Sequence, residues 1–397
     1  MKEGNRVIAV IFFAGVLVLK VSSQEQKILA GTSFEGSYFS NALSCRFINS
    51  FLSHQFLSDE IKNSNRPRMN NAFFLNNENQ LYIQSATDRL TLKFRYASAS
   101  SFPADAYHLV FEGNEAYAGL TATMHPMYFM QQSYQTLEYG KIKSFSTNQW
   151  DVKLYGGIGL VKGQQLTHLS CSKGLLYTAP DGSFLDLDLT MTYRYAENGN
   201  HLLAINGIGT SLHVDLQAES KDKKTTMQWT VSDAGIMGWM NQSREMTIDT
   251  SFRFDGLAID LFADSIAFSI NDDTISRWIK QHEHPFRKIK ALPAVFSFTL
   301  TRKISHSWDV TAGTKLYGCS RMSFPYLIAD ISYHPGEKHR ITFLLRYGFY
   351  NNLNTGLSYL FVHPKWFIRA DCLHVPSLII GRRSFSEGFF LSFGIYL

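Results

Sequence analysis

The sequence EGFFLSFGIYL, at residues 387–397, ends the chain and alternates between two kinds of side chain. Phe389, Leu391, Phe393, Ile395 and Leu397 are apolar, and the residues between them are mostly small or amphipathic. A period of two over this length predicts a β-strand with one apolar face. An unpaired terminal strand would leave a bare sheet edge. This pattern therefore favours a closed barrel, in which the last strand pairs with the penultimate strand and with the first.

The N-terminus has the features of an export signal. Lys2 and Arg6 precede an apolar run at residues 7–19, and the small residues at 21–23 suit a cleavage site. The run is shorter than the ~20 residues that a membrane-spanning helix needs. We therefore expect residues 1–23 to be a cleaved signal peptide, with an N-terminal anchor helix as the alternative.

The composition is typical of a membrane wall built from strands. Aromatic residues make up 14% of the 397 residues and charged residues only 18%, whereas soluble proteins carry about 25% charged residues. Removing the signal segment, with three cations and one anion, lowers the net charge from +5 to about +3. This charge is too weak to indicate a nucleic-acid partner. We expect a protein of the outer membrane, surrounded by lipid.

Residues 184–195 form the clearest predicted strand inside the chain. Leu185, Leu187 and Leu189 begin one face, and Asp186 and Asp188 begin the other. A sandwich would turn the apolar face to its core, whereas a barrel turns it to lipid and leaves the charges in a wet lumen. Further strand-like segments lie at residues 90–96, 116–124, 150–158, 166–178, 201–218, 225–231, 247–254, 294–302, 307–317, 322–333, 341–350, 353–362 and 365–374.

The predicted fold is all-β: a transmembrane up-and-down antiparallel β-barrel of about 14 strands, the even number nearest the segments found. The barrel is expected to occupy residues 80–397. Residues 24–79 show no clean period and are expected to tuck into the barrel as a plug or to pack against it, followed by an exposed turn. Short helices are expected at residues 126–140 and in the long connection at 256–291, where Asp273 or Thr274 could cap a helix.

Three stretches resemble an uncharacterised family of Bacteroidota outer-membrane barrels. They are VSDAGIMGW at residues 231–239, FRFDGLAID at 252–260, and the segment from Leu292-Pro293-Ala294 to the C-terminus. That family is related to the PorV and PorP barrels of type IX secretion and, more distantly, to FadL-type fatty-acid transporters. The resemblance implies an outer-membrane barrel more than it implies an activity.

Six charged residues are candidates for lining the lumen, because each alternates with apolar residues of a predicted strand. They could form a charged pore, or they could pair with one another and fill the interior. The six are Asp186, Asp188, Arg194, Arg346, Arg369 and Asp371.

Signals for chemistry are weak. His282-Glu283-His284 lacks a third metal ligand, and the four widely spaced Cys residues could form one disulfide or stay unpaired. His168 and Ser170 would share a strand face as in outer-membrane phospholipases, but that face offers no acid to orient the His. We expect no enzyme, no catalytic residues, no cofactor and no metal.

The expected function is a channel or transporter for hydrophobic or small solutes. The alternative is a non-enzymatic accessory or structural barrel of a secretion or surface-assembly complex, with a secreted or surface protein as its partner. The C-terminal strand is expected to engage the barrel-assembly machinery.

Overall fold

A computed structural model describes residues 28–196, 204–240, 243–255, 282–319, 322–348, 352–375 and 384–397. The predicted signal peptide and most of the 256–291 connection lie outside these residues. The elements are β1 (Leu29–Ser40), α2 (Cys45–Leu52), α3 (Asp59–Lys62), β2 (Asn70–Gln84), β3 (Asp88–Pro103), α4 (Ala104–Phe111), η1 (Glu115–Tyr117), β4 (Thr121–Thr123), β5 (Met127–Ser146), β6 (Trp150–Thr178), β7 (Leu185–Ala196), β8 (Gly207–Ser220), β9 (Thr225–Trp239), β10 (Ser243–Phe254), β11 (Glu283–Pro285), β12 (Ile289–Ala291), β13 (Ala294–Lys303), β14 (Trp308–Cys319), β15 (Met322–Gly336), β16 (His339–Gly348), β17 (Asn352–His363), β18 (Trp366–Cys372) and β19 (Ser386–Tyr396).

The strands form a closed antiparallel barrel with 14 positions around the ring. β4 with β5, β7 with β8, β9 with β10, and β11 to β13 each share one position, because they follow one another along the same path of the wall. The ring closes where β1 pairs with β19 on one edge and with β2 on the other. Closure leaves the transmembrane sheet without a bare edge, as a wall in lipid requires.

The closing strand β19 confirms its predicted role. It pairs with β18 and with β1, and its apolar residues Phe389, Leu391, Phe393, Ile395 and Leu397 are 37–64% exposed on the outer surface. Apart from Phe390, inward residues of β19 such as Gly388, Ser392 and Gly394 are small, and neighbours approach them closely. A Cβ at Gly394 would overlap the ring of Phe367.

The outer surface carries an apolar face all around the ring. Exposed examples from five other strands are Ile158, Trp229, Leu327, Phe343 and Leu357. A closed sheet that is apolar outside and polar inside is the architecture of outer-membrane barrels. The protein is therefore an outer-membrane β-barrel.

The two ends of the barrel differ in their connections. At one end, turns at residues 85–87, 147–149, 221–224, 304–307, 337–338 and 364–365 join the strands. At the other end, α2 and α3 join β1 to β2, and α4, η1 and β4 join β3 to β5. Because such barrels have short periplasmic turns and long extracellular loops, the helices lie at the extracellular end.

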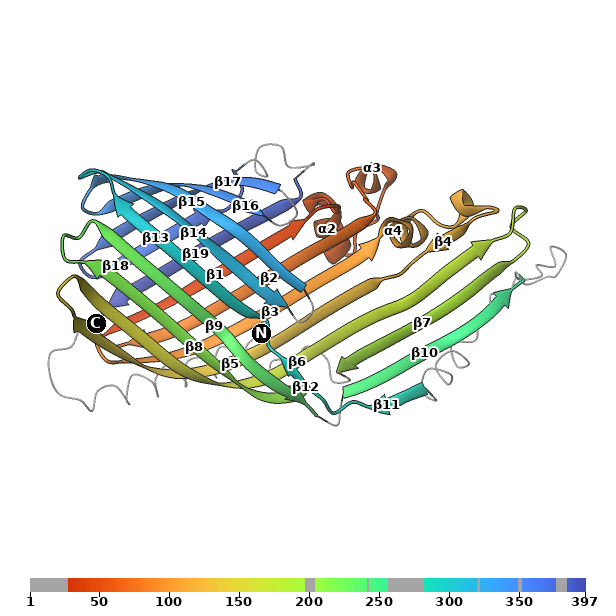
Figure 1. The fold of residues 1–397 in the computed structure, drawn as a ribbon, viewed down its shortest axis with the longest axis horizontal. Helices are drawn as coiled ribbons and strands as arrows, with labels where there is room; N and C mark the ends of the chain where they lie inside the picture. Colours follow the sequence, from red (N-terminus) through yellow and green to blue (C-terminus); the bar gives the residue numbers. More distant parts are fainter. Residues whose placement is uncertain are drawn as a thin grey trace.

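Part of the wall rises beyond the rest at the extracellular end. β6 is 29 residues long; its first half pairs with β8 and its second half with β7, which in turn pairs with β10. We call β7, β10 and residues 167–178 of β6 the raised wall, which extends to the right in Figure 1.

None of the described helices is long and apolar enough to cross a membrane.

Strand structure begins earlier than the sequence indicated. β1 and most of β2 fall within residues 24–79, which we had expected to be a plug, and only the helices between them lie outside the wall. Residues 127–140 belong to β5, so this stretch is strand and not helix. The inward face of β5 carries Gln132, Tyr134, Thr136 and Glu138, so hydropathy does not alternate although burial does.

Candidate functional site

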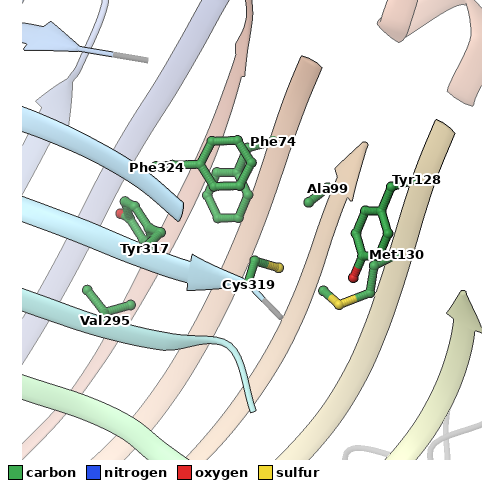
Figure 2. Close-up of a cluster of buried hydrophobic side chains, with 8 residues drawn as sticks. All are labelled: Phe74, Ala99, Tyr128, Met130, Val295, Tyr317, Cys319 and Phe324. Carbon is green, nitrogen blue, oxygen red and sulfur yellow. The ribbon is translucent and has the colours of Figure 1, made fainter. Parts of the chain in front are cut away.

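Side chains from opposite sides of the ring meet inside the barrel near its extracellular end. Phe74 of β2 stacks on Phe324 of β15, with ring centroids 4.7 Å apart, and lies 5.1 Å from the ring of Tyr317 on β14. Figure 2 shows these rings between the two walls. We call this buried cluster the aromatic layer; its members are Phe74, Ala99, Tyr128, Met130, Val295, Tyr317, Cys319 and Phe324.

A cavity of about 250 Å³ lies beside the aromatic layer. Phe39 and Tyr326 line this cavity and also pack against the aromatic layer, so these two rings form the boundary of the cavity toward the layer. Three of the six predicted lumen residues, Arg346, Arg369 and Asp371, line it as well. We call it the roofed cavity.

The charges around the roofed cavity are arranged in pairs. Arg346 holds Asp330 through both guanidinium nitrogens Nη1 and Nη2, and Arg369 donates from Nε and Nη2 to Asp371 at 2.9 and 2.7 Å. Lys315 Nζ lies 3.3 Å from Glu35 Oε1. Buried charges require pairing of this kind. Of the two alternatives that the sequence left open, a charged pore or mutual pairing, these contacts match mutual pairing.

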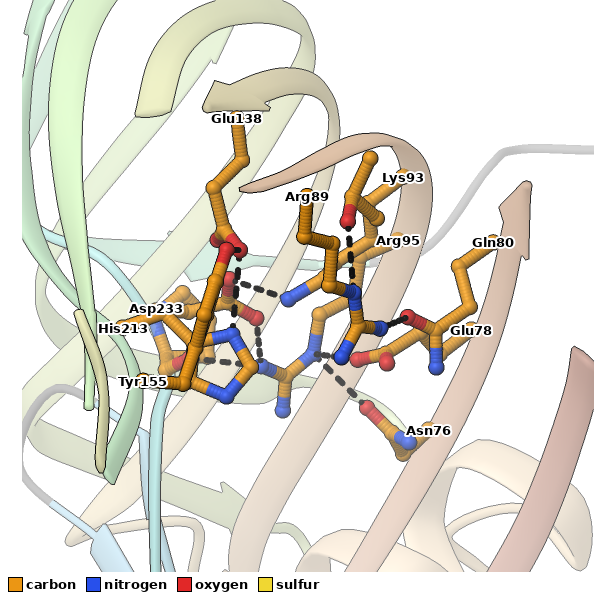
Figure 3. A network of polar contacts seen from close by, with 12 residues as sticks. Asn76, Glu78, Gln80, Arg89, Lys93, Arg95, Glu138, Tyr155, His213 and Asp233 are labelled. Atoms are coloured by element: carbon orange, nitrogen blue, oxygen red, sulfur yellow. Dashed lines mark hydrogen bonds and ion pairs between the residues drawn. The ribbon is translucent and has the colours of Figure 1, made fainter. Parts of the chain in front are cut away.

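A second group of charges crosses the barrel between β3 and β9. Asp233 of β9 is fully buried and accepts hydrogen bonds from Lys93 Nζ at 2.9 Å and Arg95 Nη1 at 2.5 Å. Arg95 Nη1 also donates to the carbonyl oxygen of Pro293 at 2.9 Å, and Arg95 Nε donates to Asn76 Oδ1 at 3.0 Å. Figure 3 shows the two β3 cations converging on Asp233. We call Lys93, Arg95 and Asp233 the ionic bridge.

Asp233 reaches the lumen because β9 is irregular at this point. Its φ is +56°, a left-handed conformation that is uncommon for residues other than Gly. The register between β8 and β9 shifts here, so that Ser232 and Asp233 oppose the single residue His213. This two-against-one arrangement is a β-bulge, and it turns the carboxylate of Asp233 toward β3.

His213, opposite the bulge, belongs to a neighbouring contact group. Its Nδ1 lies 3.1 Å from Glu138 Oε1, which also accepts from the Tyr155 hydroxyl at 2.5 Å. Glu138 is almost completely buried. The lumen at mid-height is therefore filled by paired polar side chains from β3, β5, β6, β8 and β9.

The other three predicted lumen residues lie on the raised wall. Asp186 forms a two-bond pair with Arg253 of β10, at 2.7 and 2.8 Å, and Asp188 lies 2.6 Å from Lys173 of β6. Both carboxylates line a groove of about 490 Å³, away from the roofed cavity. Arg194 pairs with Glu245 of β10. A functional role for the six residues stays a prediction.

The residues weighed for chemistry show no catalytic arrangement. Beside His168 Nδ1 the structure places the guanidinium of Arg194, at 3.3 Å, where a hydrolase triad would have a carboxylate. Among the described residues, no three His, Cys, Asp or Glu side chains gather as a metal site. Cys45, Cys171, Cys319 and Cys372 carry free thiols.

The sequence did not single out the ionic bridge. Lys93 and Arg95 alternate with apolar residues in the segment 90–96, so their shared inward face was readable. Asp233 was noted only as part of a family-like motif. The side chain of Asp233 points inward because of the β-bulge in β9, and no local sequence pattern predicts that bulge.

No family model matches this chain, and no curated protein matches it. Among solved structures, the toluene transporter TodX of Pseudomonas putida is similar, with 7% identity over 96% of this chain and 92% of that one, at a TM-score of 0.40. The monoaromatic hydrocarbon channel CymD has 8% identity over 94% and 89%, with a TM-score of 0.37. The translocator domain of autotransporter NalP from Neisseria meningitidis has 7% identity over 100% and 95%, with a TM-score of 0.33. No functional conclusion follows from similarity at this level, and kinship with the PorV and PorP barrels stays a prediction.

Proposed function

We propose that this protein is a non-enzymatic accessory or structural barrel of an outer-membrane assembly. The observation that carries this proposal is the meeting of side chains from opposite walls in the aromatic layer, where Phe74 and Phe324 stack at 4.7 Å. Side chains that pack across the lumen stiffen a barrel and narrow any aqueous path through it. The raised wall adds a large surface beyond the membrane for a partner.

Planar-bilayer recordings test the proposal directly. The purified barrel is expected to insert without measurable conductance at any applied voltage. Cross-linking in the native membrane, through residues of the raised wall, is expected to recover a defined partner polypeptide in stoichiometric amount. Steady conductance, or recovery of the barrel alone, would contradict the proposal.

A gated passage for a small solute is the second candidate function. The roofed cavity favours it, because five charged side chains line a space large enough for a small molecule. Conductance or liposome swelling that appears only with one class of solute would support this candidate over the first.

A further inference from the structure

The wall of the roofed cavity has more cationic than anionic side chains. Lys315, Arg346 and Arg369 line it, together with the two carboxylates of Glu35 and Asp371. The partner of Arg346, Asp330, does not line the cavity. Because Asp330 neutralises Arg346, three cations face three carboxylates, and an anionic occupant depends on the hydrogen-bond donors that these pairs leave unused.

Arg369 presents unused hydrogen-bond donors to this space. Its side chain is 46% exposed although it points into the barrel, and its guanidinium stacks over the ring of Phe390 with 5.1 Å between Cζ and the ring centroid. The pair with Asp371 occupies Nε and one hydrogen of Nη2. A guanidinium has five N–H donors in a planar fork, so the Nη1 side remains available.

The other two cations add to the same excess of donors. Arg346 uses Nη1 and Nη2 on Asp330, and Nη1 also donates to the carbonyl oxygen of Leu345 at 3.0 Å, which leaves Nε and one hydrogen of Nη2. Lys315 has three N–H donors and reaches Glu35 at 3.3 Å, while Glu35 also accepts from the Tyr317 hydroxyl at 2.7 Å. Part of the acceptor capacity of Glu35 is thus taken by a neutral donor, and the cations keep donors for a further partner.

Apolar side chains complete the cavity. Ile328, Leu373 and Phe390 line it beside the charged groups, so an occupant can place carbon atoms there. A carboxylate matches the planar fork of an arginine better than a spherical anion does. We propose that the roofed cavity binds a small organic carboxylate. This proposal gives the second candidate function its solute class, but binding does not require that the ligand cross the membrane.

Calorimetry on the detergent-solubilised full-length barrel tests the proposal. Butyrate and succinate are expected to bind, whereas butylammonium, of the same carbon length as butyrate, is not. Arg369→Gln is expected to weaken carboxylate binding at least tenfold, because it removes the charge and the fork together. Arg253→Gln is the matched control: it breaks a similar two-bond pair on the raised wall and should leave binding unchanged.

Several outcomes would overturn the proposal. They are equal binding by the Arg369→Gln variant, equal or tighter binding of butylammonium or inorganic phosphate, and no detectable carboxylate binding by the wild type. If a variant fails to fold, the preference of the wild type for butyrate and succinate over butylammonium and phosphate decides whether the proposal holds. Arg369→Lys, which keeps the charge without the fork, should bind with intermediate affinity. A barrel that binds carboxylates yet never conducts would retain this proposal and reject solute passage.

Discussion

At the scale of single residues, burial decides how much an ion pair matters. Asp233 and its partners Lys93 and Arg95 have side chains no more than 3% exposed, whereas Asp186 and Arg253 are 41% and 54% exposed. Removing one partner of a buried pair leaves an uncompensated charge and costs about 3–5 kcal/mol, while an exposed pair contributes about 0–1 kcal/mol.

We therefore expect Asp233→Asn to destabilise the barrel by about 3–5 kcal/mol. The same change at Asp186 should cost less than about 1 kcal/mol and is the matched control. Urea unfolding in detergent micelles, followed by tryptophan fluorescence, measures both. Equal shifts of the two midpoints would show that the ionic bridge does not stabilise the fold.

At the scale of elements, the outward face of the closing strand fixes β19 in lipid. A double variant, Phe393→Lys with Ile395→Lys, places two charges on this face, each costing about 2–4 kcal/mol near the middle of the bilayer. We expect no membrane assembly, measured as loss of the heat-modifiable folded band on gels.

The control for this variant places the same two charges in water. Ser305→Lys with His306→Lys changes exposed residues of the turn between β13 and β14 and should assemble normally. Normal assembly of the β19 variant would overturn the lipid-facing assignment.

Strands could be predicted where one face is apolar and the other polar, as in β7, β14 and β19. β2 was missed because Asn77 and Asn79 lie on the face opposite Asn76 and Glu78, which contact Arg95 inside the barrel. Polar residues on both faces leave no hydropathy period to read. β5 also lacks a hydropathy period. It is held as a strand by hydrogen bonding to β6 over its whole length.

The candidate site was less predictable than the strands. Arg346, Arg369 and Asp371 could be placed on inward faces by counting from apolar neighbours. The aromatic layer beside their cavity could not be predicted, since Phe74 and Phe324 are 250 residues apart in sequence and meet only when the ring closes. A contact across a lumen depends on the cross-section of the whole barrel.

At the scale of the whole molecule, the aromatic layer crosses the lumen near the extracellular end, beside the roofed cavity. We expect the double variant Phe74→Ala with Phe324→Ala to create conductance in planar bilayers where the wild type shows none. The control is Phe343→Ala with Phe389→Ala, which removes two exposed rings from the outer surface. If the Phe74→Ala/Phe324→Ala variant shows no conductance, the polar side chains at mid-height close the lumen without the aromatic layer.

The seam between β1 and β19 also governs when this protein can fold. Leu29 pairs with Tyr396, and Ser392 Oγ donates to the carbonyl oxygen of Thr32 across 360 positions of sequence. Contacts this distant are slow to form, because the chain between them must first be ordered. Until the last residues have been synthesised and delivered, β1 and β18 both present open edges that can aggregate. We therefore expect that a stop codon a dozen residues early yields a degraded chain and not a smaller barrel.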